Sequence, residues 1–190
     1  FSKYAEVGYV WDFAGDRDDH VRRVGLGFPL TNGWNIKKQL TAFTDEHSEL
    51  AGNIDHVIAH QIPVGKPARV VATQRVAWAG DVVGTCQADT GGGLQTAFWS
   101  GMEAGRAAAN GDLMLYQKKW DSEIYPHLLR HYKIKKAMYR IGTSNLSSLF
   151  PLMRSFNVRT EDASKEIPRL LWHIVKNKPS LLVTVLPSLI

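Results

Sequence analysis

Residues 76–109 decide the fold, and they read VAWAGDVVGTCQADTGGGLQTAFWSGMEAGRAAA. A short apolar run ends in Gly80-Asp81, a loop of glycines and small residues follows, and Gly91-Gly92-Gly93 opens a helical pattern. Free N–H groups at a helix N-terminus, with its positive dipole end, favour an anion or an electron-rich ring edge. The stretch predicts a strand, a ligand-binding loop and a helix; an ordinary Gly-rich turn is the alternative.

Asp81 lies where the predicted strand ends. Ligands of open α/β sheets collect at the carboxyl ends of strands, so this carboxylate is suited to accept hydrogen bonds from cofactor hydroxyl groups, with a turn or cap role as the alternative. Small and apolar residues recur along the following helix at three- and four-residue intervals: Leu94, Ala97, Phe98, Gly101, Ala104, Gly105 and Ala108. We expect this face to pack closely against a sheet or a ligand.

The segments before this stretch predict strands and one helix. Residues 7–13 and 21–28 predict a hairpin, and residues 34–49 predict an amphipathic helix. Apolar residues alternate over 54–64, which predicts another strand, and the second of two apolar bursts in 69–80 predicts a buried strand.

From residue 113 onward the pattern is helical. We expect a break or kink at Pro126 and a last helix over residues 164–176. The chain thus divides into a substrate-binding and catalytic β-sheet region (1–75), a cofactor loop and helix (76–112) and a basic helical region (113–190).

Composition limits the class of protein. The chain has 190 residues, 44% hydrophobic residues, one Cys and a net charge of +5, which indicates a folded domain without an internal disulfide. No apolar run reaches the ~18 residues of a spanning helix. Because a single Cys gives no sign of an oxidising compartment, we expect a cytoplasmic protein, with peripheral attachment at the membrane as the alternative. Residues 1–112 hold 10 Lys and Arg against 13 Asp and Glu, whereas residues 113–190 hold 13 against 5. The basic part predicts a solvated face or a surface for an anionic partner.

Residues 76–109 resemble the second flavin-binding motif of the p-hydroxybenzoate-hydroxylase-like flavoproteins, and within that superfamily they are most similar to the geranylgeranyl reductase family. Two segments agree in order: Tyr9-Val10-Trp11-Asp12-Phe13 with Gly25-Leu26-Gly27 resembles the aromatic and Gly-x-Gly signature, and residues 60–65 (HQIPVG) resemble the stretch that leads into the Gly-Asp strand. Ala14 replaces a family Pro, Val82-Val83 replaces Ala-Ala, and Gln87-Ala88-Asp89-Thr90 stands where another Pro is expected.

The resemblance implies an α+β fold, the C-terminal part of an FAD-binding flavoprotein. It implies that the pyrimidine edge of FAD lies at the helix start, and it assigns cofactor binding to Gly80, Asp81, Gly84, Gly91, Gly92 and Gly93. Tyr9, Trp11 and Phe13 would line an apolar tunnel for a polyprenyl substrate, with ordinary core packing as the alternative. The usual dinucleotide fingerprint is absent, because Phe28-Pro29-Leu30 follows Gly25-Leu26-Gly27. We therefore expect a fragment that is inactive by itself.

The implied enzyme is an oxidoreductase that reduces C=C bonds of a geranylgeranyl-type lipid. Its electron donor, NAD(P)H or ferredoxin, and its catalytic residues remain open. The alternatives are a flavin monooxygenase or quinone-linked oxidoreductase of the same superfamily, and a basic lipid-surface-binding domain without enzyme activity. The basic run Lys133, Lys135, Lys136 and Arg140 favours an anionic membrane surface over nucleic acid, because a polyprenyl lipid is drawn from a bilayer.

The remaining polar residues predict no metal site. His56 and His60 lie in an extended segment without a third ligand. His127 and His131 have helical i, i+4 spacing among basic residues, which favours a solvated face. Cys86 is expected to be a small buried side chain.

Overall fold

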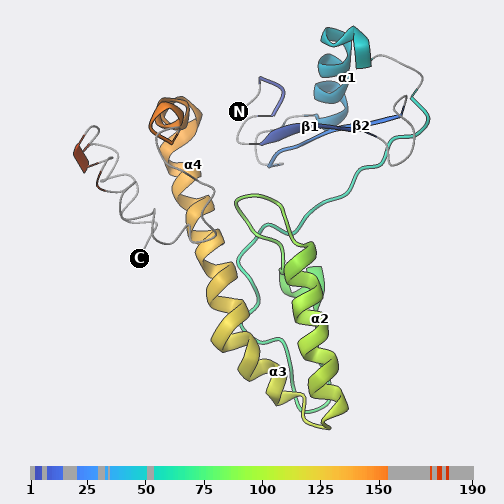
Figure 1. Ribbon diagram of the computed structural model, residues 1–190, viewed down its shortest axis with the longest axis vertical. Coiled ribbons are helices and arrows are strands. Elements are labelled where there is room, and N and C mark those ends of the chain that lie inside the picture. Colours follow the sequence, from blue (N-terminus) through green and yellow to red (C-terminus); the bar gives the residue numbers. More distant parts are fainter. Residues whose placement is uncertain are drawn as a thin grey trace. The chain divides into compact units, whose positions relative to one another are not determined.

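The computed structural model describes residues 3–5, 8–14, 21–29, 33, 35–50 and 54–153, with single residues at 172, 175, 176 and 179. The chain forms two compact units: Phe1–Ala59 with Gly142–Asn157, and His60–Ile141 with Val158–Ile190 (Figure 1). A hairpin and several helices make the class α+β, which confirms the predicted fold class. The three-part division of the chain stays a prediction, and the helix expected over 164–176 lies almost entirely outside the described residues.

The first unit contains a β-hairpin and a helix. Strand β1 (Tyr9–Ala14) pairs antiparallel with β2 (Arg22–Gly27), so the predicted hairpin is confirmed. Helix α1 (Ile36–Glu46) begins after Asn35, whose Oδ1 accepts from the Lys38 N–H at 3.0 Å, and a 3-10 turn η2 (Ser48–Leu50) follows. The side-chain cap at Asn35 explains why the helix starts two residues later than the sequence pattern predicts.

The second unit is mainly helical. A 3-10 turn η3 (Gly80–Val83) precedes α2 (Leu94–Ala109), which lies beside α3 (Met114–Lys119) and a π-helical turn η4 (Trp120–Ile124) (Figure 1). Helix α4 (Tyr125–Met153) follows; its regular geometry is interrupted at Gly142, whose φ is 74° and where the chain passes into the first unit. The core joins α2, α3, η4 and the start of α4 to the extended chain before η3, and its buried members are Val71, Ala72, Val83, Ala107, Tyr116, Trp120, Ile124, Tyr125 and Leu128.

The predicted break at Pro126 takes the form of the π turn. The Tyr125 N–H donates to the carbonyl of Trp120, five residues earlier. Proline has no N–H and its ring crowds the carbonyl four residues before it, so a regular α-helix is strained at this point. A wider turn immediately before Pro126 relieves that crowding, and the chain continues as α4.

The strand predicted over 54–64 and the buried strand predicted for the second apolar burst of 69–80 are both wrong. Residues 54–64 form no regular element, and none of the described strands pairs with them. In the second segment the chain folds back sharply: the Thr73 N–H donates to the Val76 carbonyl at 2.7 Å, and the Trp78 N–H donates to the Val71 carbonyl at 2.9 Å. Val71 and Ala72 are buried, whereas Val76 and Trp78 of the burst predicted to be buried are exposed.

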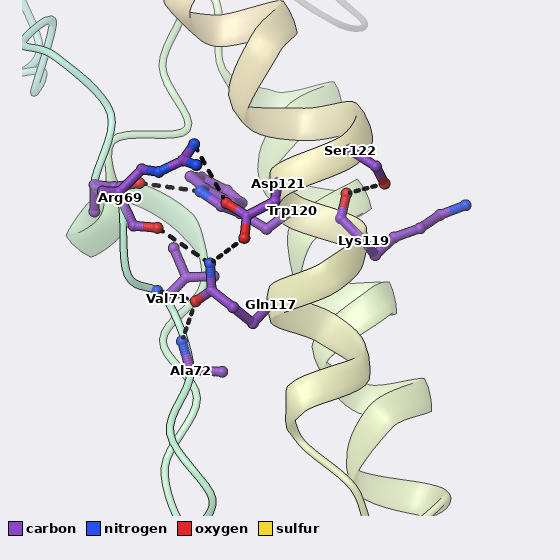
Figure 2. Close-up of polar contacts among 9 residues, drawn as sticks. Arg69, Val71, Ala72, Gln117, Lys119, Trp120, Asp121 and Ser122 are labelled. Atoms are coloured by element: carbon purple, nitrogen blue, oxygen red, sulfur yellow. Dashed lines mark hydrogen bonds and ion pairs between the residues drawn. The ribbon is translucent and has the colours of Figure 1, made fainter.

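Side chains from α3 and η4 take the place of a neighbouring strand along residues 68–72 (Figure 2). The Gln117 Oε1 accepts from the Val71 N–H at 2.8 Å and the Ala72 N–H at 3.2 Å. Its Nε2 donates to the Arg69 carbonyl at 3.1 Å and to Asp121 Oδ2 at 3.2 Å. One amide side chain therefore satisfies three backbone groups of this extended segment.

Two aromatic side chains extend this pattern. The Trp120 indole N–H donates to the Ala68 carbonyl at 3.0 Å, and the Tyr116 hydroxyl donates to the Trp78 carbonyl at 3.1 Å. Both rings are fully buried and meet edge to face with centroids 6.2 Å apart. Burial raises the pKa of Tyr116 to about 12, so the hydroxyl stays a donor under physiological conditions.

We predict that Gln117→Met destabilises the protein by about 2 kcal/mol, because the N–H groups of the buried residues Val71 and Ala72 lose their acceptor while side-chain volume is nearly conserved. The measurements are the urea midpoint of the natural protein that carries this sequence and hydrogen exchange at Val71 and Ala72. Gln74→Met, at an exposed position of the neighbouring turn, is the matched control. Unchanged exchange at both amides would contradict the assigned role of Gln117.

Candidate functional site

The predicted cofactor residues lie in one folded segment, residues 80–93, at the start of α2. Gly80, Gly84 and Gly91 have φ values of 75°, 72° and 75°, a left-handed conformation that favours glycine. The Gly80 N–H donates to the hydroxyl of Ser100 at 3.1 Å, and Ser100 is fully buried in α2. This contact joins η3 to α2, while the Asp81 side chain in the first turn of η3 is exposed to solvent.

A tight turn closes the second part of the loop. The Gln87 N–H donates to the Gly92 carbonyl at 2.7 Å, and the Gly91 N–H donates to the Gln87 carbonyl at 2.8 Å. The Thr90 hydroxyl accepts from the Gly92 N–H at 3.2 Å and donates to Gln87 Oε1 at 3.1 Å. Thr90 and Gln87 thus brace the glycines from within the loop.

The N-terminus of α2 has no side-chain cap. Gly93 occupies the cap position and makes no side-chain hydrogen bond, and the first turn contains no acidic residue. A Cβ at Gly93 would stand 3.2 Å from Cys86 Cα, so the residue is tightly packed on its protein side. The first N–H groups of the helix are consequently donors without a side-chain acceptor and without a repelling carboxylate in that turn.

Two histidines of α4 contact this loop, which the sequence interpretation missed. His131 Nδ1 lies 2.8 Å from Asp89 Oδ1, with side-chain exposures of 20% and 11%, and Gln87 Nε2 lies 3.4 Å from His127 Nε2. The two imidazole centroids are 4.7 Å apart. The prediction of a solvated face is wrong for both histidines, because they pack against a loop some forty residues earlier.

Hydrogen-bonding rules assign the protons. An ionised carboxylate can only accept, so His131 Nδ1 carries the donated hydrogen, and an amide nitrogen can only donate, so His127 Nε2 is the acceptor. Burial is the main cause that lowers the pKa of His127, followed by the charges of His131 and Arg130. The neutral form of His127 that this lowering favours is the one that can accept from Gln87.

Cys86 and Lys135 also contact backbone carbonyl groups of the second unit. Cys86 is buried, as predicted, with Sγ 3.0 Å from the Gly91 carbonyl, and burial raises the pKa of its thiol to about 11. Lys135 Nζ donates to the Val64 carbonyl at 2.8 Å, and burial lowers the pKa of this amine. In the basic run only Lys136 and Arg140 belong to the exposed class, and membrane binding by the run stays a prediction.

The aromatic residues predicted to bind substrate lie on β1, which belongs to the first unit, whereas the loop belongs to the second unit. Tyr9, Trp11 and Phe13 share one face because strand side chains alternate. Trp11 lies across Gly25, its partner in β2, and a Cβ at Gly25 would overlap the indole ring. Tyr9 is 48% exposed and Phe13 is 62% exposed. Among the described residues, these two rings are therefore not packed in a core.

The face of α2 that was expected to pack closely is mostly open. Leu94 and Phe98 are 73% and 70% exposed, and no described atom lies within 4 Å of a Cβ built on Gly101 or Gly105. The buried face consists instead of Thr96, Ser100 and Ala107. The open side forms a shallow apolar hollow of about 440 Å³ lined by Leu94, Ala97, Phe98, Gly101 and Met102.

The described part of the chain contains neither a metal-binding cluster nor a membrane-spanning helix. No group of three or more His, Cys, Asp and Glu side chains there is arranged to hold a metal ion. None of its helices combines the length and the apolar character that crossing a bilayer requires.

Comparison with known proteins identifies relatives over nearly the whole chain. Proteins named digeranylgeranylglycerophospholipid reductase match 95% of it, with 28% identity for Methanothrix thermoacetophila and 26% for Methanocaldococcus jannaschii. A crystal structure of a geranylgeranyl bacteriochlorophyll reductase-like protein from Thermoplasma acidophilum matches 99% of the chain with a TM-score of 0.74 and 20% identity. No family model matches the chain.

The similarity to the geranylgeranyl reductase family is therefore confirmed, and the structural match confirms the fold. The chain spans about half the length of these relatives: it covers 47% of each curated reductase and 49% of the Thermoplasma acidophilum chain.

The geometry of the hairpin predicts different outcomes for two glycines. Gly25→Ala should destabilise the first unit by about 1–3 kcal/mol, because its Cβ overlaps the Trp11 ring and forces it aside. Gly27→Ala should have little effect, because its Cβ would make an ordinary contact 3.6 Å from the same ring. Thermal unfolding of the natural protein with each substitution measures both. Equal destabilisation would show that Trp11 does not occupy the Gly25 surface.

Proposed function

We propose that the natural protein carrying this sequence is an FAD-dependent reductase of carbon–carbon double bonds in a polyprenyl glycerophospholipid. The observation that carries the proposal is the similarity, over 95% of the chain, to proteins named digeranylgeranylglycerophospholipid reductase. That name gives the substrate class, a glycerophospholipid that carries geranylgeranyl chains. The Gly-rich loop in front of an uncapped helix supports the cofactor part of the proposal.

The residues of the loop fit a flavin. Gly91, Gly92 and Gly93 present main chain without side chains, and the first turn of α2 offers N–H donors with no carboxylate among its residues. The positive end of the helix dipole stabilises negative charge placed there, which suits the pyrimidine edge of the ring system. When bound and reduced by its electron donor, NAD(P)H or ferredoxin, the flavin would supply a hydride to one carbon of a double bond, while the other carbon takes a proton.

We assign Asp81 to another part of the same cofactor. It lies ten residues before the glycines in sequence, its side chain is exposed, and η3 is fixed to α2 through Ser100. Its carboxylate is available to accept hydrogen bonds from hydroxyl groups of the ribityl region. Gly80 and Gly84 bracket Asp81 with left-handed backbone, and a Cβ at Gly84 would press on Pro67 at 3.3 Å.

The aromatic face of β1 fits an extended hydrocarbon. Trp11 is held in place across Gly25, and its ring centroid lies 5.7 Å from that of Tyr9. Tyr9 and Phe13 leave much of their ring surface uncovered on the same side of the strand. A polyprenyl chain that covers these rings gains about 25 cal/mol for each Å² of apolar surface removed from water. We assign this face to substrate binding.

The test of the proposed function uses the full natural protein. We expect it to purify yellow with the absorbance of bound flavin and, once reduced, to add two hydrogens to each double bond of a geranylgeranyl glycerophospholipid, measured by mass spectrometry. A colourless protein that does not take up added FAD would refute the proposal. A hydroxylated lipid formed with oxygen consumption would show a monooxygenase instead.

For the cofactor residues, we predict that Asp81→Asn weakens FAD binding roughly ten-fold, because a charged acceptor of hydroxyl hydrogen bonds becomes a neutral amide. The dissociation constant is measured by equilibrium dialysis with added FAD. Asp55→Asn, a fully exposed carboxylate outside the loop, is the matched control and should bind FAD like the wild type. Equal affinities of the two variants would remove Asp81 from the cofactor site.

A further inference from the structure

The loop over residues 84–93 needs restraint from outside itself. Four of its ten residues are glycines, the residue type that loses most conformational freedom when a chain is ordered. The loop contains no proline that would limit its backbone. Its internal hydrogen bonds brace residues 87–92 but do not anchor that turn to a helix. The side-chain contacts that do so come from α4.

The contact between Asp89 and His131 is the stronger of the two made by α4. The N–O distance is 2.8 Å and both side chains are largely buried, so solvent competes weakly for this hydrogen bond. The second contact, between Gln87 and His127, is longer at 3.4 Å and joins neutral groups. His127 and His131 are one helical turn apart, so a single face of α4 holds two positions of the loop.

We propose that His131 is a positioning residue for the flavin site: by donating from Nδ1 to Asp89 it fixes the conformation in which the loop presents Gly91–Gly93 to the cofactor. The role in cofactor binding rests on the proposed function. No chemical step is assigned to His131, because it acts through Asp89.

The pairing also has an electrostatic consequence. Asp89 lies four residues before Gly93, the N-cap of α2, and an uncompensated carboxylate near that point opposes negative charge on a bound ligand. The hydrogen bond that His131 donates holds the Asp89 carboxylate against α4. Loss of His131 should therefore change the properties of the bound flavin as well as the order of the loop.

The test compares His131→Ala and His131→Asn in the full natural protein. Without FAD, hydrogen exchange of residues 84–93 reports the order of the loop; with FAD, the dissociation constant and the flavin absorbance bands report the site. We expect H131A to speed exchange throughout the loop, weaken FAD binding roughly ten-fold and shift the absorbance bands. H131N places an amide N–H at the position of Nδ1–H and should restore wild-type behaviour in all three measurements.

Two further variants isolate the pair. Asp89→Asn added to H131A should cause no additional loss of affinity, because the interaction is already absent. Lys118→Ala, at an exposed position of α3, should leave exchange and affinity unchanged.

Unchanged loop exchange in H131A would overturn the proposal, as would an H131N variant that is as impaired as H131A. A wild-type protein that binds no FAD would refute the proposed function instead, and the exchange measurement would still decide whether His131 orders the loop.

Discussion

The second unit depends on how the backbone of residues 68–72 is hydrogen-bonded. Side chains of α3 and η4 act as its partners in place of a neighbouring strand. Gln117 serves three backbone groups, and Trp120 serves the carbonyl of Ala68. A buried backbone group without a partner is costly, so these contacts determine where the extended chain can lie. Because η3 and the glycine loop follow directly from that chain, the position of the candidate cofactor site is set by an amide and an indole on a neighbouring helix.

From this anchor the loop is held on two sides. Ser100 of α2 receives the Gly80 N–H, and His131 of α4 reaches Asp89. The first turn of α2 has no side-chain cap, and its N–H groups are the donors that the electron-rich edge of a ligand requires. The same arrangement explains why a glycine-rich segment can be ordered: the glycines give access to the main chain, and contacts at the flanking residues limit the conformational freedom that glycines add.

The parts of the fold that local sequence determines could be predicted. The hairpin, α1, α2 and the break at Pro126 follow from alternation, helical spacing and the missing N–H of proline. The strands over 54–64 and 69–80 could not be excluded, because alternation predicts an extended chain but cannot show that a partner strand exists. The pairing of Asp89 with His131 was equally inaccessible: the i, i+4 histidines were visible, but nothing in their neighbourhood points to a carboxylate 42 residues away. The face of α2 that carries small residues was expected to pack closely, but it is open. Small residues allow a neighbouring element to approach closely, but they do not show that such an element is present.

The π turn over Trp120–Ile124 changes the direction in which the side chains after it point. In this way it connects the packing of the core with the contacts that α4 makes to the loop over residues 84–93. In a regular α-helix each residue advances by about 100°, so side chains spaced four apart drift by about 40° per step and leave a common face within a few turns. Yet Tyr116, Trp120, Ile124 and Leu128, all spaced by four, are all buried. The wider turn offsets this drift. The continuous helical segment from α3 into α4 therefore keeps Tyr116 and Trp120 in the core. Further along the same segment, His127 and His131 contact the loop over residues 84–93. A single widened turn before Pro126 thus determines which side chains of α4 face a loop that lies about forty residues earlier in the sequence.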